Sequence, residues 1–232
     1  MRPIERGPRP LDGDGTPRRY ARYQQARGDL IARIGEYCSY CESRLPSSLA
    51  VEHVLPKVLN PDLETEWNNF LLGCTNCNST KSARDLRLDD YYWPDSDNTL
   101  LAIKYTDEGI VSIADGLDDM QSKRASASIE LVGLDKTPDR DPEAKDRRWL
   151  HRRSAWQRAT IARRRFEAQP DNQLLHETIV DLAEESGHWS IWFTVFAGLT
   201  AMQRRFALAF GGTSMICFDD SMRPIARVGG AI

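Results

Sequence analysis

The first helical pattern in the chain comes from apolar residues that recur every three or four positions between residues 23 and 34. Thr16-Pro17 supplies a hydroxyl cap and a proline for a first turn, so we expect this helix to begin there. Gly35 follows the last apolar position and predicts the end of the helix. The preceding residues, 1–16, contain three prolines and are expected to be extended.

Two short apolar runs, at residues 49–55 and 67–72, have the length of strands. The residues from Cys77 past Lys81 favour a helix. This part of the chain is therefore predicted to be a strand–loop–strand–helix unit. A β-hairpin is expected within 91–113, where turn residues separate two apolar runs.

The second half of the chain shows longer helical patterns. They predict a short helix within 120–134, a long helix from about 142 to 168 and an acidic helix at 171–185. At 188–210 the aromatic residues also fall at helical spacing, and we interpret this stripe as core rather than as a partner groove. The last apolar run, SMICF, predicts a short strand that buries Cys217. Together these elements predict an α+β protein.

The composition is that of a folded protein, since 41% of the 232 residues are apolar. The net charge of −3 does not indicate a general nucleic-acid binder, but the charge is uneven. Residues 82–145 carry 8 basic and 15 acidic side chains, and we expect this region to avoid nucleic acid and to face a protein partner. The sequence shows neither a signal peptide nor an apolar run of membrane-spanning length, so a cytoplasmic location is expected.

The long helix predicted at 142–168 bears eight arginines interleaved with aromatic residues. Such a helix suits binding to a phosphate backbone. It equally suits an amphipathic helix with a solvated basic side, whose arginines the acidic helix that follows would neutralise. Both interpretations stay open.

Four of the five cysteines form two Cys-x-x-Cys pairs, Cys38 with Cys41 and Cys74 with Cys77. Each pair offers two thiolates from one tight turn, and two such turns complete the tetrahedron that zinc prefers. A redox pair or chance spacing is the alternative, but two separate spacings of this kind favour structural zinc. A four-cysteine site leaves no open position for water or substrate, so the zinc is expected to be a scaffold.

The residues between and just after the two pairs carry other chemistry. Glu52 and His53 lie in the first predicted strand, where simple alternation would place them on opposite faces. Asn69 precedes the second cysteine pair, and Asn78 directly follows it. A lone histidine in an apolar strand is most often a core residue. The accompanying carboxylate and amides favour a functional site instead.

This order of motifs resembles the HNH endonuclease family over residues 38–82, through GEYCSYCE, VEHVLPK and WNNFLLGCTNCNSTK. With MRPIERG, YYWPDSDNTLLAIKY and GHWSIWFTVF, most of the chain is similar to the PtuB-like HNH proteins of Septu and retron anti-phage defence systems. The resemblance implies a zinc-stapled ββα-metal core, treble-clef-like, with a mainly helical C-terminal region.

The resemblance also implies roles for single residues. His53 matches the general base that deprotonates water, and Asn69 the residue that fixes the loop and orients that base. Glu52 and Asn78 match the protein ligands of a catalytic divalent ion, Mg²⁺ or Mn²⁺. The first has Glu where many relatives have Asp, and the second has Asn where the family name has His, so the choice of metal is open. Asn68 competes with Asn69 for the middle role.

Two lysines flank this group of residues. Lys57 and Lys81 are candidates for contacts with phosphate oxygens of a nucleic acid, and solvated surface is the alternative.

The chain is expected to have four regions. Residues 1–36 form an N-terminal arm and helix, 37–90 the HNH core, 91–142 a β-hairpin and linker, and 143–232 a helical region. We expect the helical region, including its Trp-rich stripe, to dock a PtuA-like ATPase, which the resemblance implies as a partner. Nucleic acid is the other partner, with a retron reverse transcriptase and its DNA as further candidates, and no membrane is expected.

The expected function is hydrolysis of phosphodiester bonds in DNA by a metal-dependent HNH endonuclease that acts in anti-phage defence. Cleavage of RNA or tRNA by an abortive-infection toxin is one alternative, because HNH sites cut either polymer and no 2′-hydroxyl reader is evident. A non-catalytic zinc module that docks a partner or a nucleic acid is the other.

Overall fold

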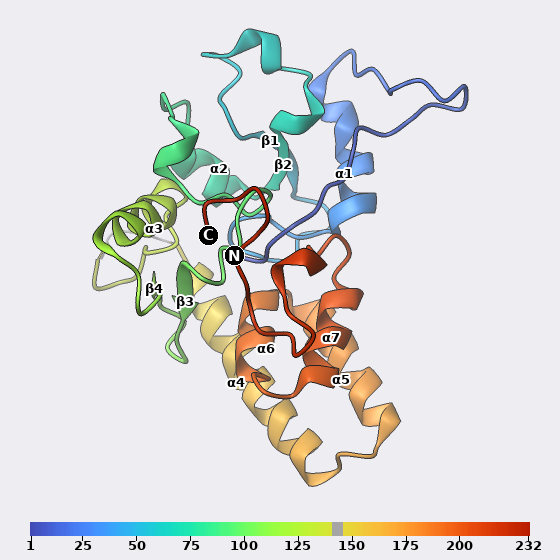
Figure 1. The fold of residues 1–232 in the computed structure, drawn as a ribbon, viewed down its shortest axis with the longest axis vertical. Helices are drawn as coiled ribbons and strands as arrows, with labels where there is room; N and C mark the ends of the chain where they lie inside the picture. Colours follow the sequence, from blue (N-terminus) through green and yellow to red (C-terminus); the bar gives the residue numbers. More distant parts are fainter. Residues whose placement is uncertain (141–145) are drawn as a thin grey trace.

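The computed structural model describes residues 1–140 and 146–232 and confirms the α+β class (Figure 1). The boundary predicted at residue 142 lies outside the described residues. Within them, the strands and α-helices are α1 (Arg27–Ile34), β1 (Ala50–His53), β2 (Phe70–Gly73), α2 (Thr75–Lys81), β3 (Ile103–Tyr105), β4 (Val111–Ile113), α3 (Asp119–Leu131), α4 (Arg148–Ala168), α5 (Gln173–Ser186), α6 (Trp189–Val195) and α7 (Thr200–Ala209).

The first sheet consists of β1 and β2, which pair antiparallel with His53 opposite Phe70 and Glu52 opposite Leu71. Every residue of β2 is buried, so its apolar run is a core strand. The α2 helix follows β2 directly, with Cys74 as its N-cap. The predicted strand–loop–strand–helix unit is therefore confirmed.

The second sheet consists of β3 and β4 and confirms the predicted hairpin over a shorter span. The residues before β3 form turns, because the Asp97 side chain accepts hydrogen bonds from the backbone N–H of Trp93 and of Ala231, each at 2.8 Å. The α3 helix packs against β4 and begins with a capping box between Asp118 and Gln121.

The first helix begins later than predicted. Residues 11–17 form a turn that projects from the molecule, seen as the dark blue loop at the upper right of Figure 1. Within it Thr16 donates its hydroxyl to Asp14 at 2.7 Å instead of capping a helix. A 3₁₀ helix, Tyr23–Ala26, then leads into α1, which ends at Gly35 as predicted.

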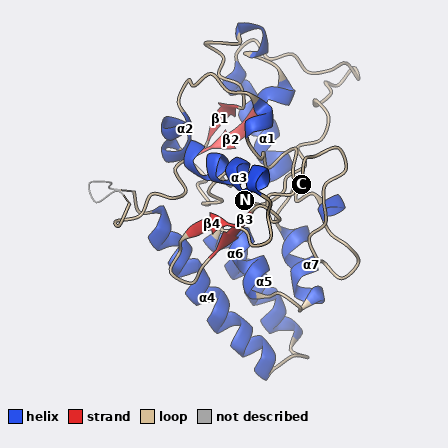
Figure 2. Cartoon of the chain, turned by 60° about the vertical axis from the view of Figure 1, so that its left-hand side comes forward, coloured by secondary structure: helices blue, strands red, loops and turns tan. Residues whose placement is uncertain are grey.

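The C-terminal helices form a layer in which α4 packs along α5 and α6, and α5 packs against α7 (Figure 2). Trp189, Trp192 and Phe196 of the aromatic stripe have 0% of their surface exposed. The stripe is therefore core, as its helical spacing indicated. The expectation that it docks a partner is wrong, because its side chains are already covered by this chain.

Two other predictions for this half need correction. The helical pattern at 188–210 forms two helices, because the chain turns between α6 and α7 at Gly198, whose φ of 84° cannot continue an α-helix. The SMICF run forms a 3₁₀ helix, Met215–Cys217, rather than a strand. Cys217 is buried as predicted.

Both termini lie near the middle of the molecule, between the β1–β2 unit and the helical layer (Figures 1 and 2). The Met1 ammonium donates to the Tyr105 hydroxyl at 2.8 Å. Arg2 donates to the carbonyls of Ile34 and Phe210, both at 2.7 Å. Residues of all four predicted regions thus contribute to one hydrophobic core. The described helices include none that is long and apolar enough to cross a bilayer.

Two arginines of α4, Arg148 and Arg152, are buried and join the helical layer to the rest. Arg148 donates to Cys77 Sγ at 2.9 Å and pairs with Asp146 at 2.6 Å, while Arg152 donates to the Gly109 carbonyl at 2.7 Å. The other arginines of the predicted basic helix are partly or fully exposed. In the described chain, the ion pairs include none between them and the carboxylates of α5.

Replacing Arg148 with Ala should lower the free energy of unfolding by about 3–5 kcal/mol, because a buried carboxylate and buried carbonyls would lose their partner. Arg164→Ala is the matched control, since Arg164 is exposed on the same helix, and its effect should stay within about 0.5 kcal/mol. Urea unfolding followed by circular dichroism measures both. Equally small effects would show that the Arg148 contacts do not hold the helical layer in place.

Candidate functional site

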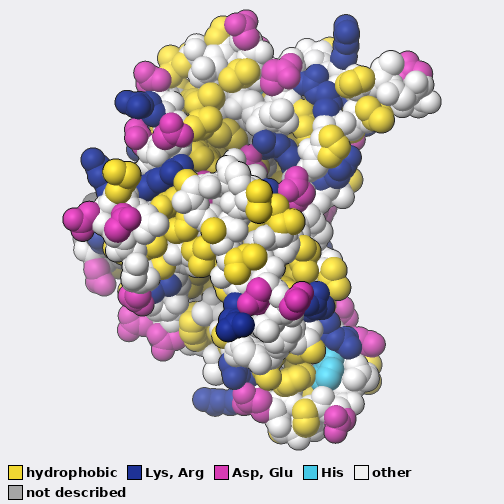
Figure 3. Space-filling model, viewed as in Figure 1, with side chains coloured by type: hydrophobic (Ala, Val, Ile, Leu, Met, Phe, Trp, Pro, Cys, Tyr) yellow, Lys and Arg dark blue, Asp and Glu magenta, His cyan; other side chains and the backbone are white. Residues whose placement is uncertain are grey.

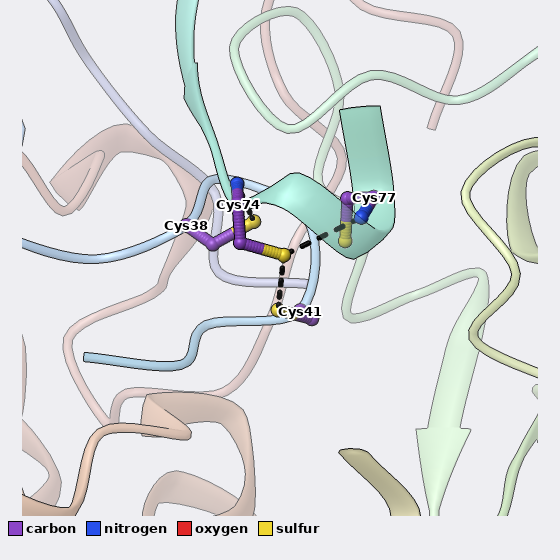
Figure 4. A group of neighbouring side chains, drawn as sticks. All are labelled: Cys38, Cys41, Cys74 and Cys77. Atoms are coloured by element: carbon purple, nitrogen blue, oxygen red, sulfur yellow. Dashed lines mark hydrogen bonds between the residues drawn. The ribbon is translucent and has the colours of Figure 1, made fainter. Parts of the chain in front are cut away.

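The four paired cysteines converge on one point (Figure 4). Their Sγ atoms all lie within 4.8 Å of one another, and Cys41 Sγ is 3.7 Å from Cys74 Sγ. Four sulfurs at about 2.3 Å from a tetrahedral zinc ion lie about 3.8 Å apart, so the spacing fits zinc. The backbone N–H groups of Cys74 and Cys77 point at Cys38 Sγ and Cys74 Sγ, each at 3.4 Å. Among the described residues, these four thiols are the group of three or more Cys, His, Asp or Glu side chains close enough to enclose a metal ion.

The protonation of the thiols also fits a bound cation. Burial raises the pKa of Cys38 and of Cys77 well above the usual value. Hydrogen bonds from the other three thiols lower the pKa of Cys41. Four buried thiolates cannot ionise side by side without a compensating charge, and a divalent ion supplies it. The Arg148 guanidinium, hydrogen-bonded to Cys77 Sγ, adds a fixed positive charge beside this cluster.

A separate hollow of about 290 Å³ lies between β1, α2 and the loop that follows β1. Glu52, His53 and Asn78 all line it, although strand alternation predicted opposite faces for the first two. They meet because the hollow lies at the end of β1, where the chain bends at Val54 and Leu55. Asn78 reaches it from the exposed side of α2.

Glu52 is 2% exposed and pairs with Lys81, whose Nζ lies 2.9 Å from Glu52 Oε1. The contact is an ion pair that falls outside ideal hydrogen-bond geometry. Burial raises the pKa of Glu52, and the Lys81 charge only partly offsets this. A buried carboxylate that lines a hollow is a suitable ligand for a divalent cation.

Gly73 lets the backbone of β2 pass close to this carboxylate. A β-carbon at position 73 would lie 2.8 Å from Glu52 Cγ and 3.8 Å from Asn78 Cβ. Any larger residue would push Glu52 out of its present place. The glycine directly before Cys74 therefore fixes the position of the carboxylate.

His53 is held by one hydrogen bond and two aromatic rings. Its Nε2 lies 2.9 Å from the Glu64 carbonyl, and its ring packs edge-on against Tyr23 and Phe70, with centroids 4.7 and 5.3 Å away. Burial lowers the pKa of His53, so the neutral imidazole is favoured. With Nε2–H donating to the carbonyl, Nδ1 carries the lone pair that can accept a proton.

Asn69 does not line the hollow but fastens the loop beside it. Its Oδ1 accepts from the Leu55 N–H at 2.7 Å, and its Nδ2 donates to the carbonyls of Leu55 and Leu63 at 2.9 and 3.3 Å. Asn68 is exposed, its carbonyl accepts from Arg6, and its side chain makes no hydrogen bond within the described residues. The geometry therefore favours Asn69 over Asn68 as the residue that fixes the loop.

The two lysines differ in burial. Lys81 is 2% exposed, and its Nζ donates to the His53 carbonyl at 2.7 Å in addition to pairing with Glu52. It is therefore an internal cation, and the solvated-surface alternative is wrong in its case, whereas its contact with a phosphate stays a prediction. Lys57 remains partly exposed, with its Nζ 2.7 Å from Glu64 Oε1 and 4.5 Å from the centre of the Tyr23 ring.

Sequence reasoning missed three residues of this region. Tyr23, which packs on His53, belongs to an apolar helical face, and that pattern gives no sign of the contact. Gly73 carried a signal in the LLGC segment, a glycine inside a strand. Arg148 carried none, because nothing in its own segment indicates that it would reach Cys77 across 71 positions.

Comparison with known proteins agrees with this geometry. Residues 38–84 match the family model described as HNH endonuclease. Over 78 residues the chain is 37% identical to the Septu protein PtuB of Bacillus thuringiensis. That match covers 32% of this chain and 30% of the relative. The similarity to HNH endonucleases thus lies in residues 38–84, the segment that holds the four clustered cysteines, Glu52, His53 and Asn78.

Purified protein should contain one zinc ion per chain, because the four thiols form one closed site. Cys77→Ser should reduce the zinc content and lower the melting temperature, whereas Cys217→Ser, at a buried cysteine outside the cluster, should leave the zinc content unchanged. Inductively coupled plasma mass spectrometry and thermal unfolding measure the two effects. Full zinc occupancy in Cys77→Ser would contradict the four-cysteine site.

Proposed function

We propose that the chain is a metal-dependent HNH endonuclease that cleaves DNA in anti-phage defence, together with a PtuA-like ATPase. One observation carries the proposal. Glu52, His53 and Asn78 line a single hollow, so a carboxylate, a neutral imidazole and an amide face the same small volume. The zinc cluster is closed by four thiols and takes no part in the chemistry.

In this proposal His53 is the general base. Its Nδ1 accepts a proton from the attacking water, while the Glu64 carbonyl holds Nε2 and fixes the orientation of the ring. Asn69 positions the base indirectly, because it fastens the loop through Leu55 and Leu63. The lowered pKa keeps His53 unprotonated at neutral pH, as a base must be.

Glu52 and Asn78 would hold the catalytic ion, which we propose is Mg²⁺ or Mn²⁺. Both residues offer oxygen, the ligand atom that these ions prefer. When bound, the ion supplies positive charge to the scissile phosphate and to the leaving oxygen. Because Lys81 already neutralises much of the Glu52 charge, the two protein ligands alone form a weak site. A phosphate oxygen of the substrate is then needed to complete it.

The nucleic acid is expected to meet a small basic surface rather than a broad one. On the face shown in Figure 3, Lys and Arg side chains are interspersed with Asp and Glu and form no continuous band. Lys57 is the cation at the hollow that reaches solvent, and we propose it as a phosphate contact. DNA is the proposed substrate, as expected for a nuclease of anti-phage defence.

The partner surface also needs a new location. The aromatic stripe is buried, but other apolar side chains of the helical region lie on its outside. These exposed residues are Ile161 on α4, Leu174 and Leu182 on α5, and Leu208 on α7. We propose that a PtuA-like ATPase docks on this outer side of the region 143–232.

Cleavage of duplex DNA should require Mg²⁺ or Mn²⁺, stop on chelation, and fall by about 100-fold or more in His53→Ala, because a positioned general base contributes about 10²–10⁴ in rate. Asn69→Ala should also slow cleavage, whereas Asn68→Ala, at its exposed neighbour, should not. A gel assay with labelled duplex DNA and with total tRNA, run with and without the ATPase, measures all of these.

Three results would each contradict part of this proposal. Cleavage of tRNA but not of DNA would make the chain an RNA nuclease. Full activity of His53→Ala would remove the assigned base. Intact defence against phage in cells that carry His53→Ala would indicate a non-catalytic zinc module.

A further inference from the structure

A second cavity, of about 480 Å³, lies between the zinc-binding loop, the start of α2, and the helices α4 and α5. It is distinct from the catalytic hollow, because the two share no lining residue. Most of the residues that line it have polar or basic side chains. Those used below are Arg44, Ser48, Asn76, Arg148, His151, Ser154, Arg158 and Glu185.

The cleft is preformed, because two contacts tie its opposite walls together. At one end Arg148 of α4 donates to Cys77 of α2 at 2.9 Å. At the other, the His188 N–H donates to the Glu42 carbonyl at 2.9 Å. A β-carbon at Gly187 would lie 2.6 Å from the same carbonyl, so the end of α5 approaches the zinc-binding loop as closely as a backbone can. A ligand would find the walls already in place.

Once the ion pairs within the lining are taken into account, the cleft keeps an unpaired positive charge. Glu185 is the one carboxylate in its lining, and it is ion-paired with Arg44. Arg148 forms an ion pair with Asp146 and donates a hydrogen bond to Cys77 Sγ, so its charge is already compensated. Arg158 is exposed, and no carboxylate of the described residues lies within ion-pair distance of it. It is therefore the guanidinium that an anion in the cleft can pair with.

Further hydrogen-bonding side chains accompany Arg158 in the lining of the cleft. The side chains of Ser48, Asn76, His151 and Ser154 line it, and within the described parts of the chain none of them makes a side-chain hydrogen bond. Hydroxyls, amides and arginine are the groups that contact phosphate and sugar in protein–nucleic acid complexes. The lining thus combines one available positive charge with several available hydrogen-bonding side chains.

The α2 helix connects this cleft to the catalytic hollow. Thr75 and Asn76 line the cleft, and Asn78 and Ser82 line the hollow. The exposed residues of α2 and its C-cap are all uncharged, so no carboxylate there repels a phosphate backbone. At 1.5 Å per residue, the span from Asn76 to Ser82 is about 9 Å, close to the axial length of three nucleotides of a duplex.

We propose that this cleft binds the phosphate backbone of the strand whose scissile bond lies in the hollow, a few nucleotides away. This inference rests on the proposed nuclease function and adds a second, non-catalytic contact for the substrate. Arg158 pairs with a phosphate, and the donors of α2 and α4 hold the neighbouring phosphate and sugar oxygens. An acidic peptide would match the charge of the cleft equally well, but the uncharged surface of α2 between the cleft and the hollow would not bind it specifically.

The test measures nucleic-acid binding without cleavage, in the full chain carrying His53→Ala. Arg158→Ala should weaken binding of a fluorescent DNA duplex and reduce the slope of log K against log salt by about 1, the amount lost with one phosphate contact. The loss of affinity should therefore be about fourfold larger at 50 mM than at 200 mM salt. Fluorescence anisotropy across this salt range gives both values.

Arg164→Ala is the matched control, because Arg164 is an exposed arginine of the same helix that does not line the cleft. It should leave the affinity and the salt slope unchanged. Equal effects of the two substitutions would overturn the inference, as would Arg158-dependent binding of polyglutamate without Arg158-dependent binding of DNA. Unchanged melting temperatures of both variants exclude misfolding as the cause.

The outcome can be separated from that of the proposed function. Normal cleavage with no Arg158 effect on binding contradicts the cleft alone. If Arg158→Ala weakens binding but the chain with His53 intact cleaves no nucleic acid, the cleft is supported and the nuclease assignment is contradicted.

Discussion

The structure depends on one requirement, which is that four thiols meet at one point. They come from two turns, and 33 positions separate Cys41 in the first turn from Cys74 in the second. The segment between them must then return to its start, and β1 and β2 pair inside this closed loop. Closing such a loop costs conformational entropy, which the binding of zinc can offset. Glu52 and His53 at the end of β1, and Asn78 just after Cys77, reach the same hollow as a consequence of that closure.

A second constraint follows from the first, because a zinc-thiolate cluster carries net negative charge in a buried place. Arg148 donates to Cys77, and Arg152 is buried nearby on the same helix. Both arginines come from the helical region, so the C-terminal half supplies positive charge beside the cluster as well as packing. This explains why the regions expected from sequence share one core instead of folding side by side.

Local patterns predicted the parts of the fold that local physics decides. The sequence correctly predicted that the four paired cysteines meet. It also correctly predicted the strands around Glu52 and Phe70 and the end of the first helix at Gly35. The start of that helix was not predicted correctly, because Thr16 bonds to Asp14 within a projecting turn. The break at Gly198 was also missed, since a glycine in a helical pattern shows its positive φ only when tertiary packing imposes it.

The candidate site divides in the same way. Its residues were predicted from the motif, and the structure places Glu52, His53 and Asn78 together, with Asn69 fastening the adjacent loop. The burial of Lys81 was not predicted, because no sequence pattern distinguishes an exposed lysine from one that turns inward to a buried carboxylate. Long-range contacts such as Arg148 with Cys77 lay beyond any local pattern.

The most direct test of this account is a crystal structure of the full chain soaked with Mn²⁺, with anomalous scattering recorded at the zinc and manganese edges. The account predicts a zinc peak among Cys38, Cys41, Cys74 and Cys77, and a separate manganese peak in the hollow against Glu52 and Asn78. The soak should include a short DNA, because the two protein ligands alone form a weak site. A hollow without manganese in that complex, or manganese bound elsewhere on the DNA-bound chain, would contradict the account.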